Sequence, residues 1–281
     1  MDPAFVGLVV IILVALAFDY TNGFHDAANS IAVAVSTEAL PPRVALALAA
    51  VMNLVGALIG GGLVGAALAA AHTVQWVGVL NDVIVPMIVS PLVGFGLGYL
   101  FMLALLWTFR RANVSKANRN FRTAQIFSSA TMALGHGMQD AQKAMGIITL
   151  ALFTAGEIDS FEVPFWVVLA AAGAISAGTY AGGFRIIRTM GRRIIQLTPT
   201  GGFAAQTVAS SVMVTTATVF AVPVSTTHIT TTSIMGVGST RRLSAVRWGV
   251  AGNIVIAWVV TLPAAAAVAA AAFFVTDLVV G

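Results

Sequence analysis

Two acidic residues lie in similar motifs within strongly apolar sequence. Asp26 follows Asn-Gly-Phe-His and Asp140 follows His-Gly-Met-Gln, so the pattern Gly-x-x-Asp-Ala occurs twice, 114 residues apart. A carboxylate at the centre of a bilayer costs about 2.5–3.5 kcal/mol, and it persists there when it is paired, protonated or bound to a cation. The two acids are therefore the first candidates for chemistry in this chain.

Amide groups surround both acids. Asn22, Asp26 and Asn29 have the spacing i, i+4 and i+7, which places them on one face of a helix. Gln142 follows Asp140 by two residues. Carboxylate and amide oxygens suit a hard cation such as Na⁺. Alternatively, an acid could take up a proton, because burial disfavours its charged form.

Lys143 is the one cation inside an apolar run, three residues after Asp140 and on the same helical face. It could form an ion pair with Asp140, contact an anion or act as a charge gate. In the simplest alternative, the acids only form such pairs or cap broken helices.

A hydroxyl-rich segment follows Pro223 and carries seven Ser or Thr residues between 223 and 233. A helix that begins after this proline presents free backbone N–H groups and the positive end of its dipole. Hydroxyls and an imidazole beside it would suit a tetrahedral oxyanion, and the candidates are Ser225, Thr226, Thr227 and His228. Alternatively, the hydroxyls bond carbonyls of their own helix and pack between spans.

The composition is that of a membrane protein. Of the 281 residues, 59% are hydrophobic and 9% are charged, which excludes an ordinary soluble enzyme and a disordered chain. The apolar residues suffice for about eight spans. Cysteine is absent, so disulfides and thiolate sites are excluded. An intramembrane hydrolase built on Ser225 or His228 is a remote alternative, because the sequence has no nucleophile elbow.

The basic residues gather in three clusters, whereas the acidic residues 157–162 lie between the first two of them. Short basic loops remain in the cytoplasm, and no aromatic residues interleave with them as in a nucleic-acid patch. We expect residues 110–122 to form a basic cytoplasmic loop. It would divide a first membrane repeat, 1–109, from a second, 123–281. The clusters comprise Arg110, Arg111, Lys116, Arg119 and Arg122; Arg185, Arg188, Arg192 and Arg193; and Arg241, Arg242 and Arg247.

Two apolar stretches look broken. The piece 27–37 is too short to cross a membrane alone, and 201–238 is interrupted at 223–228. Broken helices at membrane depth are tolerated where they line a cavity or pack against protein, and paired ones are typical of transporters. An odd number of spans per repeat would invert the second copy. We therefore predict an all-α polytopic membrane protein with two inverted-topology repeats and a re-entrant hairpin.

Together, the two acidic motifs and Pro223-Val-Ser-Thr-Thr-His228 resemble the signatures of the inorganic phosphate transporter (PiT) family. This resemblance covers nearly the whole chain. It implies a homodimeric secondary transporter in the cell membrane, which takes up inorganic phosphate with Na⁺ or H⁺ and uses no other cofactor. Some relatives carry sulfate. By position, Asp26, Asn29, Asp140 and Gln142 would serve the ion, and Ser225, Thr226, Thr227 and His228 would serve the anion.

The first half departs from the family pattern. Relatives carry a Pro-Ser-Ser-Ser-Ser-His motif there, whereas residues 51–70 of this chain contain no such motif. We infer an internal deletion near Leu58–Gly61, which would make the apolar run 43–71 a single fused span. The deletion also raises the alternative of a shortened paralogue that folds without transporting.

Overall fold

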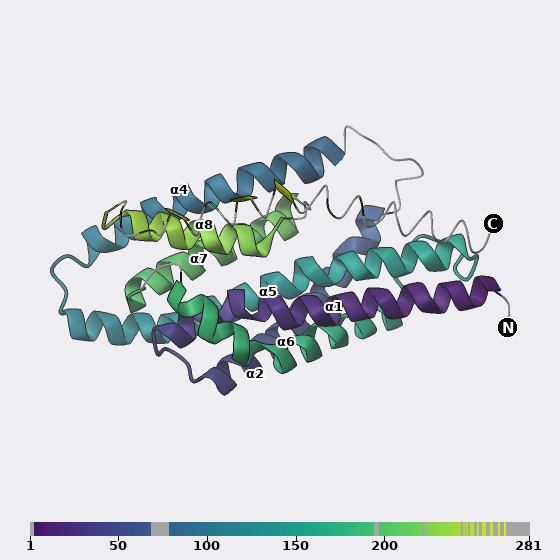
Figure 1. The fold of residues 1–281 in the computed structure, drawn as a ribbon, viewed down its shortest axis with the longest axis horizontal. Helices are drawn as coiled ribbons and strands as arrows, with labels where there is room; N and C mark the ends of the chain where they lie inside the picture. The colour runs from purple at the N-terminus through teal and green to yellow at the C-terminus, as the bar shows by residue number, and fades with distance from the viewer. Residues whose placement is uncertain are drawn as a thin grey trace.

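The computed structural model describes residues 3–68, 79–193, 197–220, 222 and 224–242, with single residues between 244 and 267. Over these residues the chain forms helices and turns without a strand (Figure 1). The elements are α1 (Pro3–Ser36), α2 (Pro42–Leu68), the π-helix η1 (Val79–Ile84), α4 (Val85–Thr108), α5 (Val114–Thr154), α6 (Phe165–Arg193), α7 (Pro199–Thr215), the π-helix η2 (Thr216–Phe220) and α8 (Thr226–Ser239).

Five helices of the described part are long and apolar enough to cross a membrane. They support the predicted all-α membrane protein, and large apolar side chains such as Leu13 and Leu92 point outward from them. The predicted total of about eight spans stays untested, because most of the stretch 245–280 lies outside the described residues, as does Arg247. The five are Phe5–Ser36, Pro42–Ile59, Val85–Thr108, Phe165–Gly182 and Pro199–Phe220.

Helix α5 is the polar centre of the bundle. It packs against α1, α2, α6 and α7, and it buries Gln125, Ser129, His136, Gln139 and Asp140. Its neighbours supply the apolar surface, so α5 can carry polar side chains without exposing them to lipid.

The first helix is continuous, which corrects the prediction that 27–37 is a separate short piece. α1 runs unbroken from Pro3 to Ser36. The segment between 19 and 29 contains no proline that would end the helix, and some of its polar side chains pack against neighbouring helices. Asp19 and Asn29, for example, are buried against protein.

Helix α2 confirms the fused span over the described residues. It runs without a break from Pro42 to Leu68, through the inferred deletion near Leu58–Gly61. The last residues of the 43–71 run lie outside the described part.

The segment 110–122 is mostly helical, although we expected a loop. α4 ends at Thr108 and α5 begins at Val114, because the Asn113 side chain accepts hydrogen bonds from the N–H groups of Ser115 and Lys116 (3.0 and 3.3 Å). Such a cap satisfies N–H groups that have no partner within the helix.

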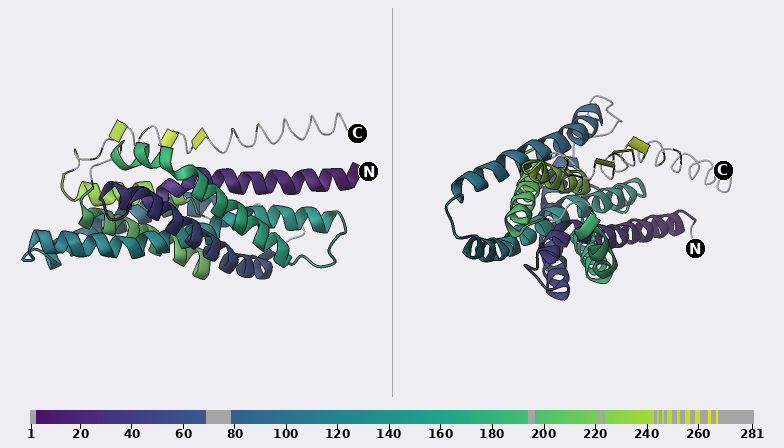
Figure 2. Two further views of the ribbon diagram at one scale, coloured as in Figure 1. Left: turned by 90° about the horizontal axis from the view of Figure 1, so that it is seen from below. Right: turned by 60° about the vertical axis from the view of Figure 1, so that its left-hand side comes forward.

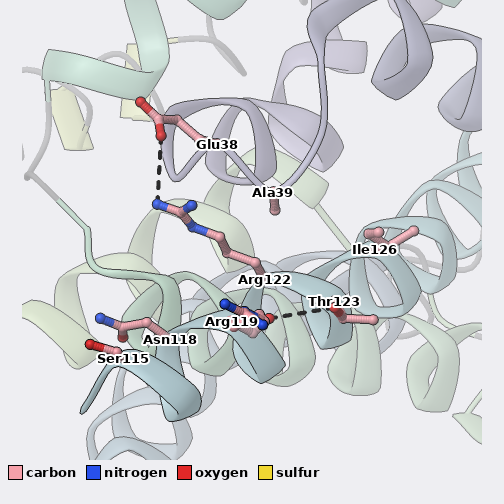
Figure 3. A pocket seen from close by; sticks show the side chains of 8 residues that line it. All are labelled: Glu38, Ala39, Ser115, Asn118, Arg119, Arg122, Thr123 and Ile126. Carbon is pink, nitrogen blue, oxygen red and sulfur yellow. Dashed lines mark hydrogen bonds and ion pairs between the residues drawn. The ribbon is translucent and has the colours of Figure 1, made fainter.

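An exposed ion pair of 3.5 Å joins Arg122 in the first turns of α5 to Glu38 after α1 (Figure 3). The two residues line a polar pocket of about 450 Å³, which Arg119 also lines. Exposed pairs of this kind contribute little stability, roughly 0–1 kcal/mol.

The interruption predicted within 201–238 is confirmed. α7 ends at Thr215, the π-helical turn η2 follows, and α8 begins at Thr226 with Ser225 as its N-cap. Pro223 itself lies outside the described residues. The break therefore places the first turn of α8 inside the protein, where Thr226 is buried.

Glycines bring two helix pairs into close contact. Gly178 and Gly182 of α6 meet the backbone of Tyr20 and Phe24 in α1, and Gly137 of α5 meets the backbone of Asn53 in α2. In lipid, helix association depends on van der Waals packing, which small residues favour. These two contacts fix how α1 and α2 lie beside the second half of the chain.

Equivalent helices of the two halves, α1 with α5 and α2 with α6, run in opposite directions (Figure 1). α1 runs from right to left in Figure 1 and α5 from left to right. In the left view of Figure 2, the start of α1 and the end of α5 lie at the same end of the bundle. Likewise, α6 runs parallel to α1, and α2 runs parallel to α5 (Figure 1). This arrangement supports the predicted inverted repeat, which stays a prediction.

Candidate functional site: a polar network between the two halves

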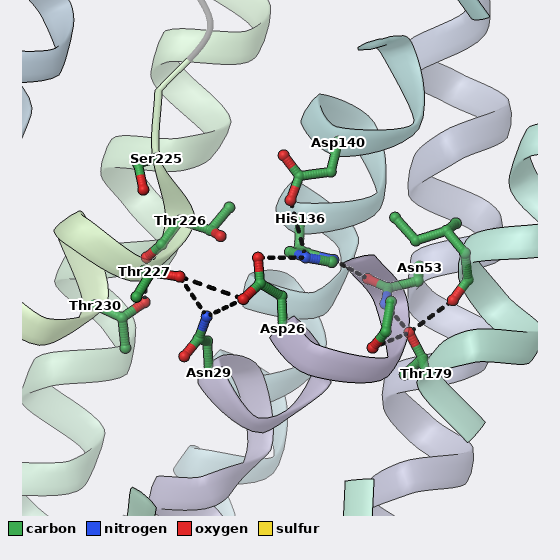
Figure 4. Close-up of polar contacts among 12 residues, drawn as sticks. Asp26, Asn29, Asn53, His136, Asp140, Thr179, Ser225, Thr226, Thr227 and Thr230 are labelled. Atoms are coloured by element: carbon green, nitrogen blue, oxygen red, sulfur yellow. Dashed lines mark hydrogen bonds and ion pairs between the residues drawn. The ribbon is translucent and has the colours of Figure 1, made fainter. Parts of the chain in front are cut away.

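Asp26 lies at the contact between α1 and the first turn of α8. Its Oδ1 accepts hydrogen bonds from Asn29 Nδ2 (3.0 Å) and Thr227 Oγ1 (3.3 Å), and Asn29 also donates to Thr227 Oγ1 (2.8 Å). The fold therefore brings the first predicted acid together with a hydroxyl of the predicted anion segment, 201 residues away (Figure 4).

His136 of α5 connects the two predicted acids. Its Nε2 lies 3.0 Å from Asp140 Oδ2 and 3.9 Å from Asp26 Oδ2. Each of the three side chains offers a ligand atom within 4.8 Å of the others. Two carboxylates this close repel each other unless positive charge lies between them. Positive charge therefore stabilises the cluster, and the imidazole, the Lys143 ammonium or a bound ion could supply it.

The hydrogen bonds behind His136 define its orientation. Thr179 Oγ1 donates to the carbonyl of Ile175 (2.8 Å), so it accepts from Asn53 Nδ2 (2.7 Å). This leaves Asn53 Oδ1 as the acceptor facing His136 Nδ1, at 3.2 Å. Both ring nitrogens of His136 thus face oxygen acceptors, and the imidazolium form satisfies both.

The two acids have different environments although their sequence motifs are alike. The Asp140 side chain is 3% exposed and is held by His136 and by Lys143 Nζ at 2.6 Å. The Asp26 side chain is 25% exposed, and its Oδ2 lies beyond hydrogen-bond distance of His136. The ion pair between Asp140 and Lys143 is therefore present, and Asp26 is the carboxylate with capacity left for a ligand.

Some hydroxyls of the segment 223–233 bond carbonyls of their own helix, and another lies near the acidic cluster as expected of an anion site. Thr230 Oγ1 donates to the carbonyl of Thr226 (2.7 Å) and Thr232 Oγ1 to that of His228 (2.8 Å), as in ordinary helix packing. Ser225 caps α8 by accepting the N–H of His228 (3.3 Å). Thr227 hydrogen-bonds to the acidic cluster, because its Oγ1 donates to Asp26 Oδ1.

Asn22 and Gln142, two residues predicted for the ion site, lie beside the network around Asp26 and Asp140. Asn22 is half-buried one turn before Asp26 and makes none of the hydrogen bonds of this network. Gln142 is half-buried two residues past Asp140, and its part in ion binding stays a prediction. His228 is half-buried in the first turn of α8.

The sequence did not point to Asn53 and Thr179. Both are fully buried, and they extend the network from α5 through α2 to α6 (Figure 4). Their only signal in the sequence was that each is a polar residue inside a long apolar run. Gln139 of the second acidic motif also joins α5 to the end of α7, because its Nε2 donates to the carbonyl of Met213 (3.0 Å) and to Thr216 (2.8 Å).

Comparison with known proteins identifies the family. The sequence profile of the phosphate transporter family matches residues 22–62 and 58–269. A probable low-affinity inorganic phosphate transporter of Rhizobium meliloti is 42% identical over 98% of this chain and 98% of its own length. A protein of the same description from Bacillus subtilis is 36% identical over 99% of this chain and all of its own length.

The same comparisons confirm the internal deletion. The two profile matches meet at 58–62, where the deletion was inferred. The Rhizobium alignment extends over 330 positions although the chain has 281 residues, so some fifty positions of the relative have no counterpart here. The junction lies within helix α2, which continues across it.

A solved structure has the same fold. The protein described as "The sodium-dependent phosphate transporter" superposes with a TM-score of 0.79 over 97% of this chain and 99% of its own, at 20% identity. The profile, the relatives and the apolar helices agree on a multi-pass membrane protein from a family of transporters, not enzymes. This chain belongs to the phosphate transporter family.

Proposed function

We propose that this chain is a symporter that moves inorganic phosphate across the cell membrane with Na⁺. The observation that carries the proposal is the contact of Thr227 with Asp26 and Asn29. It joins the acid expected to bind the coupling ion to the helix start expected to bind the anion. Sodium is favoured over a proton as the coupling ion because the similar solved structure is described as sodium-dependent.

The ion would bind at Asp26. The carboxylate, the Asn29 amide and the Thr227 hydroxyl supply the oxygen ligands that a hard cation needs. Asp140 would contribute its negative charge from the other half of the chain, within 4.8 Å of the Asp26 and His136 ligand atoms. Asn22 and Gln142 would complete the polar lining of this site.

Phosphate would bind at the first turn of α8. The N–H groups at a helix start and the dipole favour an anion, and Ser225, Thr226, Thr227 and His228 surround that turn. Lys143 is a further candidate, because its side chain is 44% exposed although it is paired with Asp140. Since Thr227 touches both sites, a cation at Asp26 would increase phosphate affinity, and phosphate would increase cation affinity by the same factor.

Other readings receive no support from the relatives. None of the findings favours sulfate or a shortened chain that does not transport, and a homodimer stays a prediction from the family resemblance.

Uptake of radiolabelled phosphate into proteoliposomes of the full chain tests the proposal. We expect uptake that follows an inward Na⁺ gradient and persists with excess sulfate. Uptake that follows a proton gradient without Na⁺ would contradict sodium coupling. If correctly inserted protein shows no uptake with any gradient, the transport proposal is wrong for this chain.

Replacing Thr227 by valine should weaken the binding of both Na⁺ and phosphate. A hydrogen bond to a charged group contributes about 1.5 kcal/mol or more, so we expect a roughly tenfold higher Na⁺ requirement for uptake. Thr230→Val is the matched control, because Thr230 bonds a carbonyl of its own helix. The assay is uptake against Na⁺ concentration. Equal curves for the two variants would show that the contact between Thr227 and Asp26 has no part in binding.

A further inference from the structure

Asp19 is a second buried acid on α1 that the proposed site does not use. Its side chain is 0% exposed, and neither carboxylate oxygen has a hydrogen-bond partner among the described residues. It lies seven residues before Asp26, thus on the same helical face and about 10 Å away along the axis. A buried carboxylate in this state must be neutral or must bind a cation.

The described surroundings of Asp19 favour a proton over a bound cation. Ala15 and Leu16, about one turn earlier on α1, pack into an apolar cluster with Met145 and Ile148 of α5. Na⁺ needs several oxygen ligands, whereas no described hydroxyl, amide or carboxyl group hydrogen-bonds to Asp19. A proton needs no additional ligand.

The charged groups near Asp19 do not neutralise it. Asp140, Lys143 and His136 of α5 act on its charge. These three already pair with one another, at 2.6 Å between Lys143 and Asp140 and 3.0 Å between His136 and Asp140. On α6, residues 165–182 include no charged or histidine side chain, and on α1 the nearest charge on the same face is the acid Asp26.

We propose that Asp19 is a proton-binding site, separate from the ion site at Asp26, and that it holds its proton at neutral pH. Loss of this proton would leave an unpaired negative charge two helical turns from Asp26. That charge would attract a cation and repel phosphate, so transport would decline as the pH rises. The effect on transport rests on the proposed function, whereas proton binding by Asp19 does not.

Infrared spectroscopy of the purified full chain, in a maltoside detergent that has no carbonyl group, tests the proton directly. We expect a carboxylic acid band at neutral pH that shifts in heavy water and is missing in Asp19→Asn. It should remain in Asp26→Asn and in Asp159→Asn, whose aspartate is exposed between α5 and α6. Asp19→Glu should move the band. A band that Asp19→Asn leaves unchanged, or that Na⁺ removes from the unaltered protein, would overturn the proposal.

The pH dependence of uptake tests the consequence for transport. Because phosphate itself titrates, the useful quantity is the uptake of Asp19→Asn divided by that of the unaltered chain at each pH. The amide mimics the neutral acid, so this ratio should rise toward alkaline pH. A constant ratio would contradict the effect on transport. If neither protein transports, the proposed function fails while the infrared result still decides the proton site.

Discussion

Proteoliposomes that contain the Asp26→Asn variant are expected to take up no more phosphate than liposomes without protein. The amide keeps the size of the carboxylate but removes its charge. Asp26 is the acid that keeps an exposed, unsaturated oxygen beside Asn29, Thr227 and His136. Removal of one partner from a buried charge pair costs about 2–5 kcal/mol, which lowers ion affinity by roughly 30-fold or more. The measurement is Na⁺-driven uptake at saturating phosphate.

Two further variants separate this loss from misfolding. Asp159→Asn changes an exposed aspartate between α5 and α6 and should transport normally. Asp140→Asn leaves the buried imidazole of His136 and the Lys143 ammonium without their carboxylate, so it should lower the yield of folded protein as well. Normal uptake by Asp26→Asn would remove Asp26 from the coupling mechanism.

Gly178→Ala should destabilise the bundle, because a Cβ at this position collides with the backbone of Tyr20 in α1. The neighbouring atoms belong to a helix backbone and cannot rotate away. Overpacking of this kind costs about 1–3 kcal/mol, so the melting temperature of the detergent-solubilised protein should fall by several degrees. The measurement is thermal unfolding followed by gel filtration of the remaining folded protein.

Gly173→Ala is the matched control on the same helix. Nothing lies within 4 Å of a Cβ built at Gly173, and alanine is a better helix former than glycine by up to about 1 kcal/mol. This variant should be neutral or slightly stabilised. If Gly178→Ala proved as stable as Gly173→Ala, the close packing of α1 against α6 would be wrong.

Much of the candidate site could be predicted from the sequence. A carboxylate in an apolar run is costly wherever the run lies, so Asp26 and Asp140 could be identified as candidate site residues without knowledge of the fold. A proline followed by hydroxyls indicated a helix start in the interior, and α8 does begin there, with Ser225 as its cap. These predictions succeeded because they depend on neighbouring residues along the chain.

Other predictions failed because local polarity is a poor guide to helix ends. The piece 27–37 was expected to be separate, yet α1 continues through it, since the second half of the chain packs against α1 and buries Asp19 and Asn29. The basic residues after Thr108 suggested a loop, yet a single side chain, Asn113, caps a helix there. The first outcome depends on packing between distant parts of the chain, whereas the second depends on a local cap that an asparagine before a helix can indicate.

By itself, the sequence determined that this is a membrane protein, that its family signatures are those of phosphate transporters, and that a segment is missing near residue 60. The tertiary structure decided that Asp140 is paired and that Asp26 keeps an oxygen available for a ligand. Helical spacing fixes only which residues share a face, whereas the helix that meets this face depends on packing across the whole chain. That packing places Thr227 beside Asp26, holds Asp140 between His136 and Lys143, and leaves Asp19 buried without a partner.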